Sequence, residues 1–152
     1  ETAVSMMLDD RGENALCRLC GVEIAYRPHR EELQQVLEHL LREAQCSLDE
    51  VDAVMIGTNG NPLNDQVYTD VCPSLVPGKR LLRYKHLFGE SYTAPGLATY
   101  AAATLLYRQR IPAHLLAGAV KEEVSASVKY ILLYNHFEGK NHSFILLSAC
   151  GK

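Results

Sequence analysis

The chain of 152 residues is predicted to fold as a single α/β domain on a largely parallel sheet. Three observations favour this class. Runs rich in β-forming residues alternate with helical patterns, the last two such runs are separated only by a short turn-forming stretch, and no repeat, low-complexity tract or linker interrupts the order. Helices between successive strands bring those strands parallel, whereas a short turn makes two strands antiparallel.

The first third of the chain predicts two strands and a helix. Residues 3–8 are a short apolar run followed by a turn signal, which predicts a strand. Residues 16–26 predict a second strand, closed by Arg27-Pro28. Apolar side chains then recur at positions three and four apart over residues 33–44, with charged residues largely on the other side, which is typical of an amphipathic helix.

The middle of the chain predicts a strand between two helical segments. A capping-box pattern at residues 47–50 indicates a short turn or helix. Residues 51–56 predict a strand that ends at a Gly-Thr-Asn-Gly stretch. The segment 64–71 predicts a helix that Pro73 limits, because proline lacks the backbone N–H that a helix interior needs.

The last part of the chain predicts a strand, a helix and a hairpin. Residues 80–85 predict a strand, and 96–108 predict a helix whose many alanines allow close packing. Two β-rich runs, 128–135 and 142–149, flank the turn-forming segment 137–141, which predicts a β-hairpin.

Composition excludes several function classes. The chain is 47% hydrophobic and 22% charged, with a net charge of −3, so it offers no general attraction for nucleic acid or an anionic membrane. Its apolar runs are far too short to span a bilayer. No signal-peptide pattern is visible, and we expect a cytoplasmic protein. Because Glu1 is not preceded by a methionine, we expect an upstream part of the polypeptide.

Five cysteines argue against a secreted disulfide framework, which favours even numbers in a shorter chain. Cys17 and Cys20 form a C-x-x-C pattern, but it falls in a predicted strand, where a spacing of three directs the thiols to opposite faces. A zinc site needs further ligands. We therefore expect reduced, buried cysteines, no metal and no cofactor.

Four segments, in order and spacing, resemble the second half of β-ketoacyl-acyl-carrier-protein synthases. Residues 1–8 are similar to the family strand EGAxxLVLE, and 48–65 to xxDIDYVxAHGTGTPLGD. Residues 84–96 are similar to TKSxxGHxxGAAG, and 135–143 to a shortened NSFGFGGTNAS. Each motif alone is weak, but the four together are fairly specific and cover nearly the whole chain.

The resemblance implies one half of a thiolase-like fold: a three-layer α/β/α arrangement with a mixed five-stranded sheet whose last strand is antiparallel. In the family two such halves form one catalytic unit, and the units dimerise. Residues 1–152 would be a single domain, the C-terminal half, with residues 1–9 a strand that belongs to the missing N-terminal half. We expect the face that the sister half would cover to cause self-association or homodimer formation.

The resemblance also implies a chemistry that this chain lacks in part. Ketosynthases use a cysteine of the N-terminal half as nucleophile, and two histidines of the C-terminal half donate hydrogen bonds to the thioester oxygen where enolate charge develops. Those two positions are Ile56 and Glu90 here. Isoleucine has no donor, and an ionised glutamate repels an enolate. Losing one such donor typically costs about 3 kcal/mol or more in the barrier.

Other residues match the motifs around that site. Lys85 and Asp65 stand at family positions, and a structural role is the favoured interpretation for Lys85. His136 and His142 flank the hairpin, and surface or hydrogen-bonded roles are commoner for such histidines than acid–base catalysis. A metal site there would want a third rigid ligand. The candidate active-site region comprises Thr58, Asp65, Lys85, His86, Asn135 and Phe137.

Two functions follow from the resemblance. The first is a non-condensing partner subunit of fatty-acid or polyketide biosynthesis, similar to a chain length factor, with an acyl carrier protein and an active ketosynthase as partners. The alternative is an active acyltransferase of the thiolase superfamily whose nucleophilic cysteine lies in the missing half. An α/β interaction module outside lipid synthesis is a third, less favoured interpretation.

Overall fold

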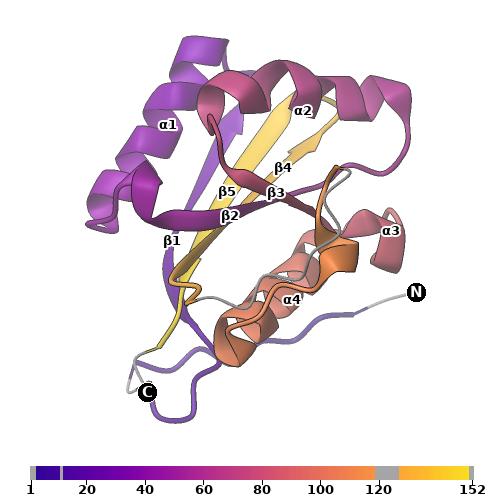
Figure 1. Ribbon diagram of the computed structural model, residues 1–152. Coiled ribbons are helices and arrows are strands. Elements are labelled where there is room, and N and C mark those ends of the chain that lie inside the picture. The colour runs from indigo at the N-terminus through magenta and orange to yellow at the C-terminus, as the bar shows by residue number, and fades with distance from the viewer. Residues whose placement is uncertain (1–2, 11, 119–126, 151–152) are drawn as a thin grey trace.

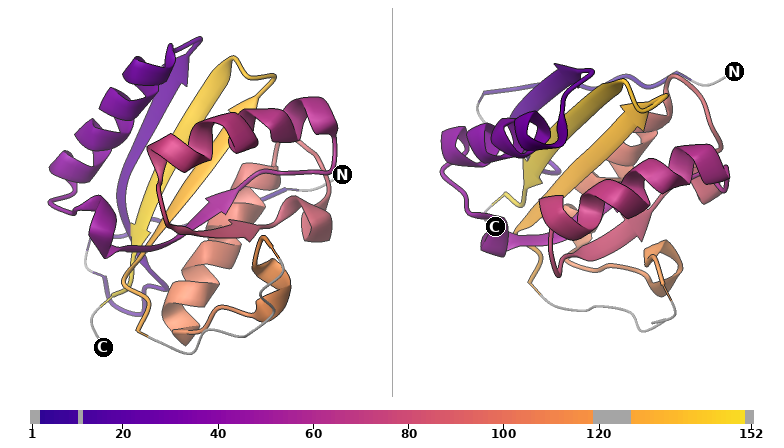
Figure 2. Two further views of the ribbon diagram at one scale, coloured as in Figure 1. Left: turned by 45° about the horizontal axis from the view of Figure 1, so that its top comes forward. Right: turned by 90° about the horizontal axis from the view of Figure 1, so that it is seen from above.

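The computed structural model is a three-layer α/β/α sandwich around one five-stranded sheet (Figure 1). Helices α1 (Arg30–Glu43) and α2 (Pro62–Leu75) cover one face, and α4 (Ala94–Arg108) covers the other (Figure 2). The described residues are 3–10, 12–118 and 127–150.

The sheet is mixed, and its strand order is β1-β5-β4-β2-β3. Strand β2 runs parallel to both of its neighbours, whereas β5 is antiparallel to both of its own. The mixed sheet and the antiparallel last strand are therefore confirmed. The strands are β1 (Arg18–Tyr26), β2 (Val51–Ile56), β3 (Arg80–Arg83), β4 (Tyr130–Phe137) and β5 (Asn141–Ser148).

Strands β2 and β4, in the interior of the sheet, are apolar on both faces because helices cover both sides of the sheet. In β4, Leu132 packs with α1 and α2 while Leu133 packs on the α4 side, and both are almost fully buried. Two hydrophobic cores result, one on each face of the sheet. Tyr68 and Leu37 belong to the first, and Leu106 belongs to the second.

Capping residues set where the helical segments begin. The carboxylate of Glu32 accepts a hydrogen bond from the backbone N–H of His29 in a capping box that starts α1. Ser47 and Glu50 form the same motif around the 3₁₀ turn η1 (Leu48–Glu50), as the sequence predicted. Asn61 caps α2 by accepting from the backbone N–H of Leu63.

Helix α4 lies close to the sheet because its contact face is made of alanine. Ala94, Ala98 and Ala102 follow one another at intervals of four residues, and each is at most 1% exposed. The predicted close packing is confirmed. Gln109 ends the helix in a left-handed conformation, and its amide donates to the carbonyls of Leu106 and Val128. The end of α4 is thereby linked to the start of β4.

Three predictions about local structure are wrong. Residues 3–8 form no strand; a strand needs a hydrogen-bonded neighbour, and this stretch pairs with none, although Val4 packs beside Gly96. Helix α2 continues past Pro73, because one missing N–H near its end is outweighed by the burial of Cys72 and Leu75. The strand predicted over 80–85 ends at Arg83, where the chain turns into helix.

The two cysteines of the C-x-x-C pattern lie on opposite faces of the sheet, as predicted, but both are only partly buried, so the prediction of buried thiols is wrong for this pair. Cys17 packs on the α4 side of the sheet and Cys20 on the α1 side. All five thiols are free, and burial raises the pKa of Cys17, Cys46 and Cys72 to about 11. Among the described residues, no three His, Cys, Asp or Glu side chains are placed to bind a metal ion, and no helix is long and apolar enough to cross a membrane.

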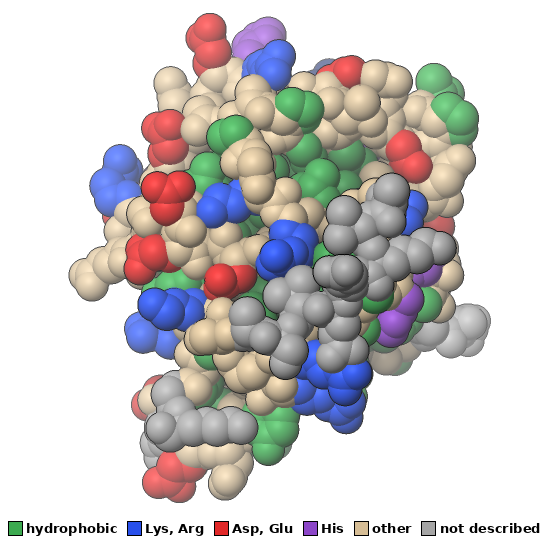
Figure 3. All heavy atoms as spheres, in the orientation of Figure 1, with side chains coloured by type: hydrophobic (Ala, Val, Ile, Leu, Met, Phe, Trp, Pro, Cys, Tyr) green, Lys and Arg blue, Asp and Glu red, His purple; other side chains and the backbone are tan. Residues whose placement is uncertain are grey.

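The surface charges are mixed. On the face shown in Figure 3, acidic and basic side chains are interspersed and lie over both helical and strand segments.

The alanine face of α4 makes a stability prediction. Replacing Ala102, which is fully buried, with leucine forces extra methyl groups between helix and sheet, so Ala102→Leu should lower the free energy of unfolding by about 1–3 kcal/mol. Urea denaturation measures the change. The matched control is Tyr100→Leu on the exposed side of the same helix, which should leave stability unchanged. Equal stability of the two variants would contradict the close packing.

Candidate functional site

The candidate site lies where three neighbouring parallel strands end. Gly57 directly follows β2, and Lys85 lies two residues after the end of β3. Asn135 is near the end of β4. The three approach so closely that a Cβ atom on Gly57 would lie 2.4 Å from Asn135 Oδ1 and 3.0 Å from Lys85 Cε. Only glycine fits at this position without displacing its neighbours.

The centre of the site is an ion pair between a buried lysine and a half-exposed glutamate. Lys85 Nζ lies 3.0 and 2.9 Å from the two carboxylate oxygens of Glu90, and the side chains are 3% and 51% exposed. The side-chain amide of Asn59 donates a third hydrogen bond, 2.6 Å long, to Glu90 Oε2. The carboxylate therefore accepts three donors, and two of them belong to one cation.

A single helical turn places these two residues together. Helix α3 (Lys85–Phe88) begins at the lysine, and Gly89 ends it with a φ of 74°. This left-handed conformation, which glycine adopts without strain, reverses the chain so that Glu90 lies beside Lys85. The Gly-Glu sequence after the turn is therefore the local cause of the ion pair.

Asp65 organises the loop between β2 and α2. Its carboxylate accepts hydrogen bonds from the backbone N–H groups of Asn59 and Gly60 at 2.9 and 3.0 Å, and from the amide of Asn64. Burial by itself would raise the pKa of Asp65, but these hydrogen bonds outweigh it, and the pKa is lowered. Asp65 thus fixes the backbone that carries Asn59 toward Glu90.

Asn135 is oriented by two buried tyrosines. The hydroxyls of Tyr68 and Tyr84 donate to Asn135 Oδ1 at 3.3 and 3.1 Å. Burial raises the pKa of both phenols, so each keeps its proton and remains a donor. The amide oxygen of Asn135 is fully used in this way, which makes the residue a structural junction between α2, β3 and β4.

Two motif residues differ in what their side chains can do. Ile56 is 4% exposed and lies in the core between the sheet and helices α1 and α2. Thr58 has a buried hydroxyl oxygen without a hydrogen-bond partner among the described residues. A buried polar atom of this kind is unusual in native proteins.

The remaining sequence candidates lie outside this cluster. His86 is exposed, and its Nε2 lies 3.1 Å from the carbonyl oxygen of His114. Phe137 is half-exposed at the tip of the hairpin, where its ring lies 5.9 Å from that of Tyr92. His136 is buried and hydrogen-bonded to backbone rather than directed at Lys85 and Glu90.

Sequence reasoning missed three members of the cluster. Asn59 is part of a Gly-Thr-Asn-Gly stretch, which indicated only a turn. Tyr68 and Tyr84 occupy apolar positions of a helix and a strand end, where a tyrosine is expected to be core. The available signal was that a buried tyrosine hydroxyl needs a partner, and Asn135 was the polar residue predicted nearby.

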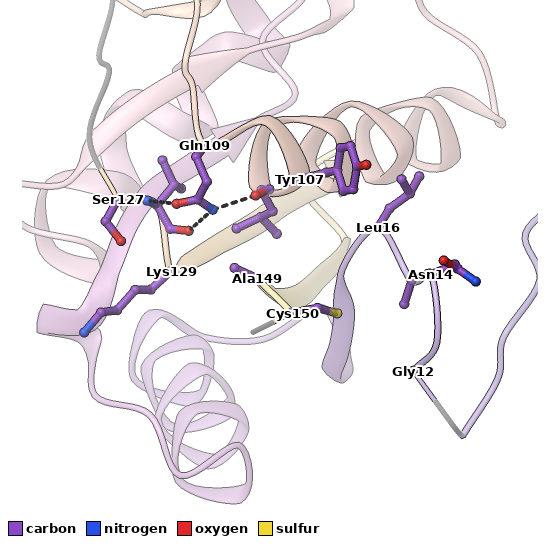
Figure 4. Close-up of a pocket in the computed structure, with 12 residues that line it drawn as sticks. Gly12, Asn14, Leu16, Tyr107, Gln109, Ser127, Lys129, Ala149 and Cys150 are labelled. Carbon is purple, nitrogen blue, oxygen red and sulfur yellow. Dashed lines mark hydrogen bonds between the residues drawn. The ribbon is translucent and has the colours of Figure 1, made fainter. Parts of the chain in front are cut away.

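A cavity of about 530 Å³ lies at the opposite end of the sheet (Figure 4). Its walls come from the loop before β1, the end of α4 and the residues that flank β4 and β5. Leu16, Val128 and Ala149 supply apolar surface, and the amide of Gln109 is already bound to backbone. The cavity is therefore separate from the cluster around Lys85, and its described lining contains no acid–base pair.

The burial of Lys85 predicts that loss of the Glu90 carboxylate lowers stability more than loss of the Glu138 carboxylate. Glu90→Gln leaves the buried Lys85 charge without its counter-charge and should lower the free energy of unfolding by about 1–2 kcal/mol, a value reduced because Glu90 is half-exposed. The control is Glu138→Gln, which removes the carboxylate from the solvent-exposed pair with Lys140 and should have no measurable effect. Thermal or urea denaturation measures the stability of both variants. Equal losses of stability would contradict the claim that the burial of Lys85 makes its ion pair important.

No protein-family model matches the chain, and no curated protein matches it either. Solved structures do. The ishigamide ketosynthase/chain length factor has a TM-score of 0.76 at 19% identity, over 93% of this chain and 40% of that one. A ketosynthase in complex with its chain length factor from Xenorhabdus doucetiae has a TM-score of 0.74 at 19% identity, over 88% and 39%.

A third match comes from a type II PKS acyl-carrier protein in complex with its ketosynthase bound to the hexaketide, with a TM-score of 0.75 at 17% identity. It covers 93% of this chain and 40% of that one. The chain thus spans about 40% of the length of these matched structures. At these identities the likeness establishes the fold: the chain has the thiolase-like fold of one half of a ketosynthase.

Proposed function

We propose that this chain is the C-terminal half of a ketosynthase-like protein of fatty-acid or polyketide biosynthesis, and that the protein is a non-condensing partner subunit of the chain-length-factor type. The observation that carries the proposal is Glu90. The motif resemblance assigns Glu90 to the second family histidine position, and its carboxylate accepts three hydrogen bonds from Lys85 and Asn59.

Condensation needs hydrogen-bond donors aimed at the oxygen where enolate charge develops. Paired with Lys85, Glu90 is an ionised acceptor with no proton to donate. It also neutralises the positive charge of Lys85. The pair therefore offers the thioester oxygen neither a neutral donor nor an unpaired positive charge.

The first family position gives no substitute. Ile56 has no polar atom, and its side chain packs into the core on the α1 and α2 side of the sheet. Two donors at about 3 kcal/mol each would together account for a rate factor of roughly 10⁴. This loss supports a partner role rather than catalysis.

An uncovered apolar face supports the proposal that a second half is missing. Strand β1 is an edge strand, and α1 covers one of its faces. Its other face carries Val22, Ile24 and Tyr26, which are 49%, 70% and 65% exposed. Helix α4 packs on β4 and β5 and leaves these side chains uncovered. Alternating apolar residues on one face of a strand are typical of a buried sheet.

The proposed partners are an active ketosynthase and an acyl carrier protein. Two of the matched structures contain a ketosynthase with its chain length factor, and a third contains an acyl-carrier protein bound to its ketosynthase. The likeness in fold makes pairing of the same kind the simplest arrangement for a protein whose own condensing groups are replaced.

The partner role has a direct test. The full polypeptide that contains this chain, co-expressed with an active ketosynthase from the same source, should purify with it as a complex and change the chain length of its product. Glu90→Gln serves as the comparison variant. It removes the charge of the ion pair with Lys85 but does not introduce the histidine of the family motif. A protein that purifies alone and leaves product length unchanged would contradict the proposal.

The alternative function gives a different result in a parallel measurement. Incubation of the full polypeptide with an acyl-carrier thioester, followed by mass spectrometry, should show no covalent acyl adduct. An adduct on a cysteine outside this chain, together with a condensed product, would instead establish the active acyltransferase.

The uncovered face makes a prediction for the chain alone. The 152-residue chain should self-associate at high concentration, because association of two copies removes the exposed apolar surface of β1 from water. Ile24→Lys should shift it toward monomer in sedimentation experiments. The control is Leu63→Lys, at an exposed leucine on α2 outside this face, and it should not change the self-association. A wild-type chain that stays monomeric would count against a missing half.

A further inference from the structure

The tip of the β4–β5 hairpin is attached to helix α2 through the buried His136, and a second buried histidine, His142, lies beside it. His136 and His142 face each other across the hairpin as a cross-strand pair, and both are at most 5% exposed. Their rings lie 5.9 Å apart, and the ring of Tyr68 on α2 lies 4.5 Å from that of His136. The hydrogen bonds of both side chains go to the hairpin and to α2 rather than to Lys85 or Glu90.

The hydrogen bonds of His136 require one neutral tautomer. The backbone N–H of Gly139 donates to Nδ1 at 3.1 Å, so Nδ1 carries no proton. Nε2 lies 3.0 Å from the carbonyl oxygen of Asn64, which can only accept, so Nε2 carries the proton. His136 thereby connects the hairpin turn to the first turn of α2 in a single arrangement.

His142 satisfies its surroundings in the same tautomer. Its Nε2 lies 3.2 Å from the carbonyl oxygen of Gly139 and donates to it. Its Nδ1 accepts from the hydroxyl of Tyr134 at 3.0 Å. Burial raises the pKa of Tyr134, so that hydroxyl keeps its proton. Gly139 thus bonds to both histidines, through its N–H to one and through its carbonyl to the other.

We propose that this hairpin tip is a pH-operated latch: its closure on α2 requires a neutral His136 and is favoured by a neutral, buried His142. A proton on Nδ1 of His136 would face the N–H of Gly139, so two donors would oppose each other and the turn would separate from the helix. Asn135 and Phe137 flank His136, and opening would therefore disturb the junction with Tyr68 and Tyr84. The latch does not depend on the proposed function.

The groups around the pair favour the neutral state. Burial is the main cause that lowers the pKa of His136, and the neighbouring His142 and Lys85 on α3 lower it further. The hydrogen bond to Asn64 and the carboxylate of Asp65 on α2 act in the opposite sense without reversing the shift. On β1, the uncharged Ala25 is paired with His142. The other titratable neighbours are Tyr68, Tyr134, Glu138 and Lys140, of which the last two form an ion pair in the turn.

The sign of the pH effect follows from that shift. When the closed state has the lower histidine pKa, the open state binds protons more tightly. The latch is therefore fully closed above the ordinary pKa of 6.5 and opens as the pH falls below it toward the lowered value. Within that interval the opening equilibrium should change by about tenfold per pH unit for each histidine.

Hydrogen exchange on the 152-residue chain tests the latch. At pH 5.5, after correction for the intrinsic exchange rate, amides of the β4–β5 tip should be less protected than at pH 7.5, by up to about tenfold for each histidine, whereas α1 should keep its protection. The double variant His136→Asn/His142→Asn has no group that titrates there, so its tip should show equal protection at both pH values. His39→Asn, an exposed histidine on α1, should behave as wild type.

If the double variant is less stable than the wild type, a second measurement on the wild-type chain tests the proposal. Imidazole proton resonances of the wild-type chain should show that His136 and His142 titrate below 6.5, the ordinary value, while His39 serves as the exposed reference. Titration of either buried histidine at or above 6.5 would overturn the proposal. Equal tip protection at pH 7.5 and 5.5 in the wild-type chain, or persistent pH dependence in the double variant, would also overturn it.

Discussion

The arrangement of the candidate site depends on the ion pair between Lys85 and Glu90. Burial of the lysine, whose side chain is 3% exposed, would be costly without a counter-charge. Gly89 reverses the chain so that the carboxylate reaches it, and Asn59 adds a third hydrogen bond. The loop that carries Asn59 is in turn fixed by Asp65. The ion pair thus connects the β2–α2 loop, which Asp65 fixes, to the α3 turn, which Gly89 reverses.

Much of the fold could be predicted from the sequence, because local patterns specify local structure. The spacing of Leu33, Leu37 and Leu40 required one apolar helical face, and the alanines of α4 required close contact with the sheet. The failures have tertiary causes. Residues 3–8 have the composition of a strand but no strand beside them, and α2 passes through Pro73 because Cys72 and Leu75 are buried around it.

The candidate site was predictable only in part. Motif positions identified Lys85, Asp65 and Asn135, which do gather at one edge of the sheet. The pairing of Lys85 with Glu90 depends on the backbone reversal at Gly89, and the burial of His136 depends on how α2 lies over the hairpin. Neither relation is encoded in the spacing of the residues. The sequence therefore indicated which groups matter, while their charge partners came from packing between segments distant along the chain.

We propose that the Lys85–Glu90 pair stands in place of a condensing site. The most direct measurement is the release of carbon dioxide from a malonyl-carrier thioester by the full polypeptide, since decarboxylation generates the enolate that the missing donors would stabilise. We expect release at the rate of the uncatalysed control, both for the native protein and for Glu90→Gln. Release well above that control in the native protein, reduced by Glu90→Gln, would contradict it.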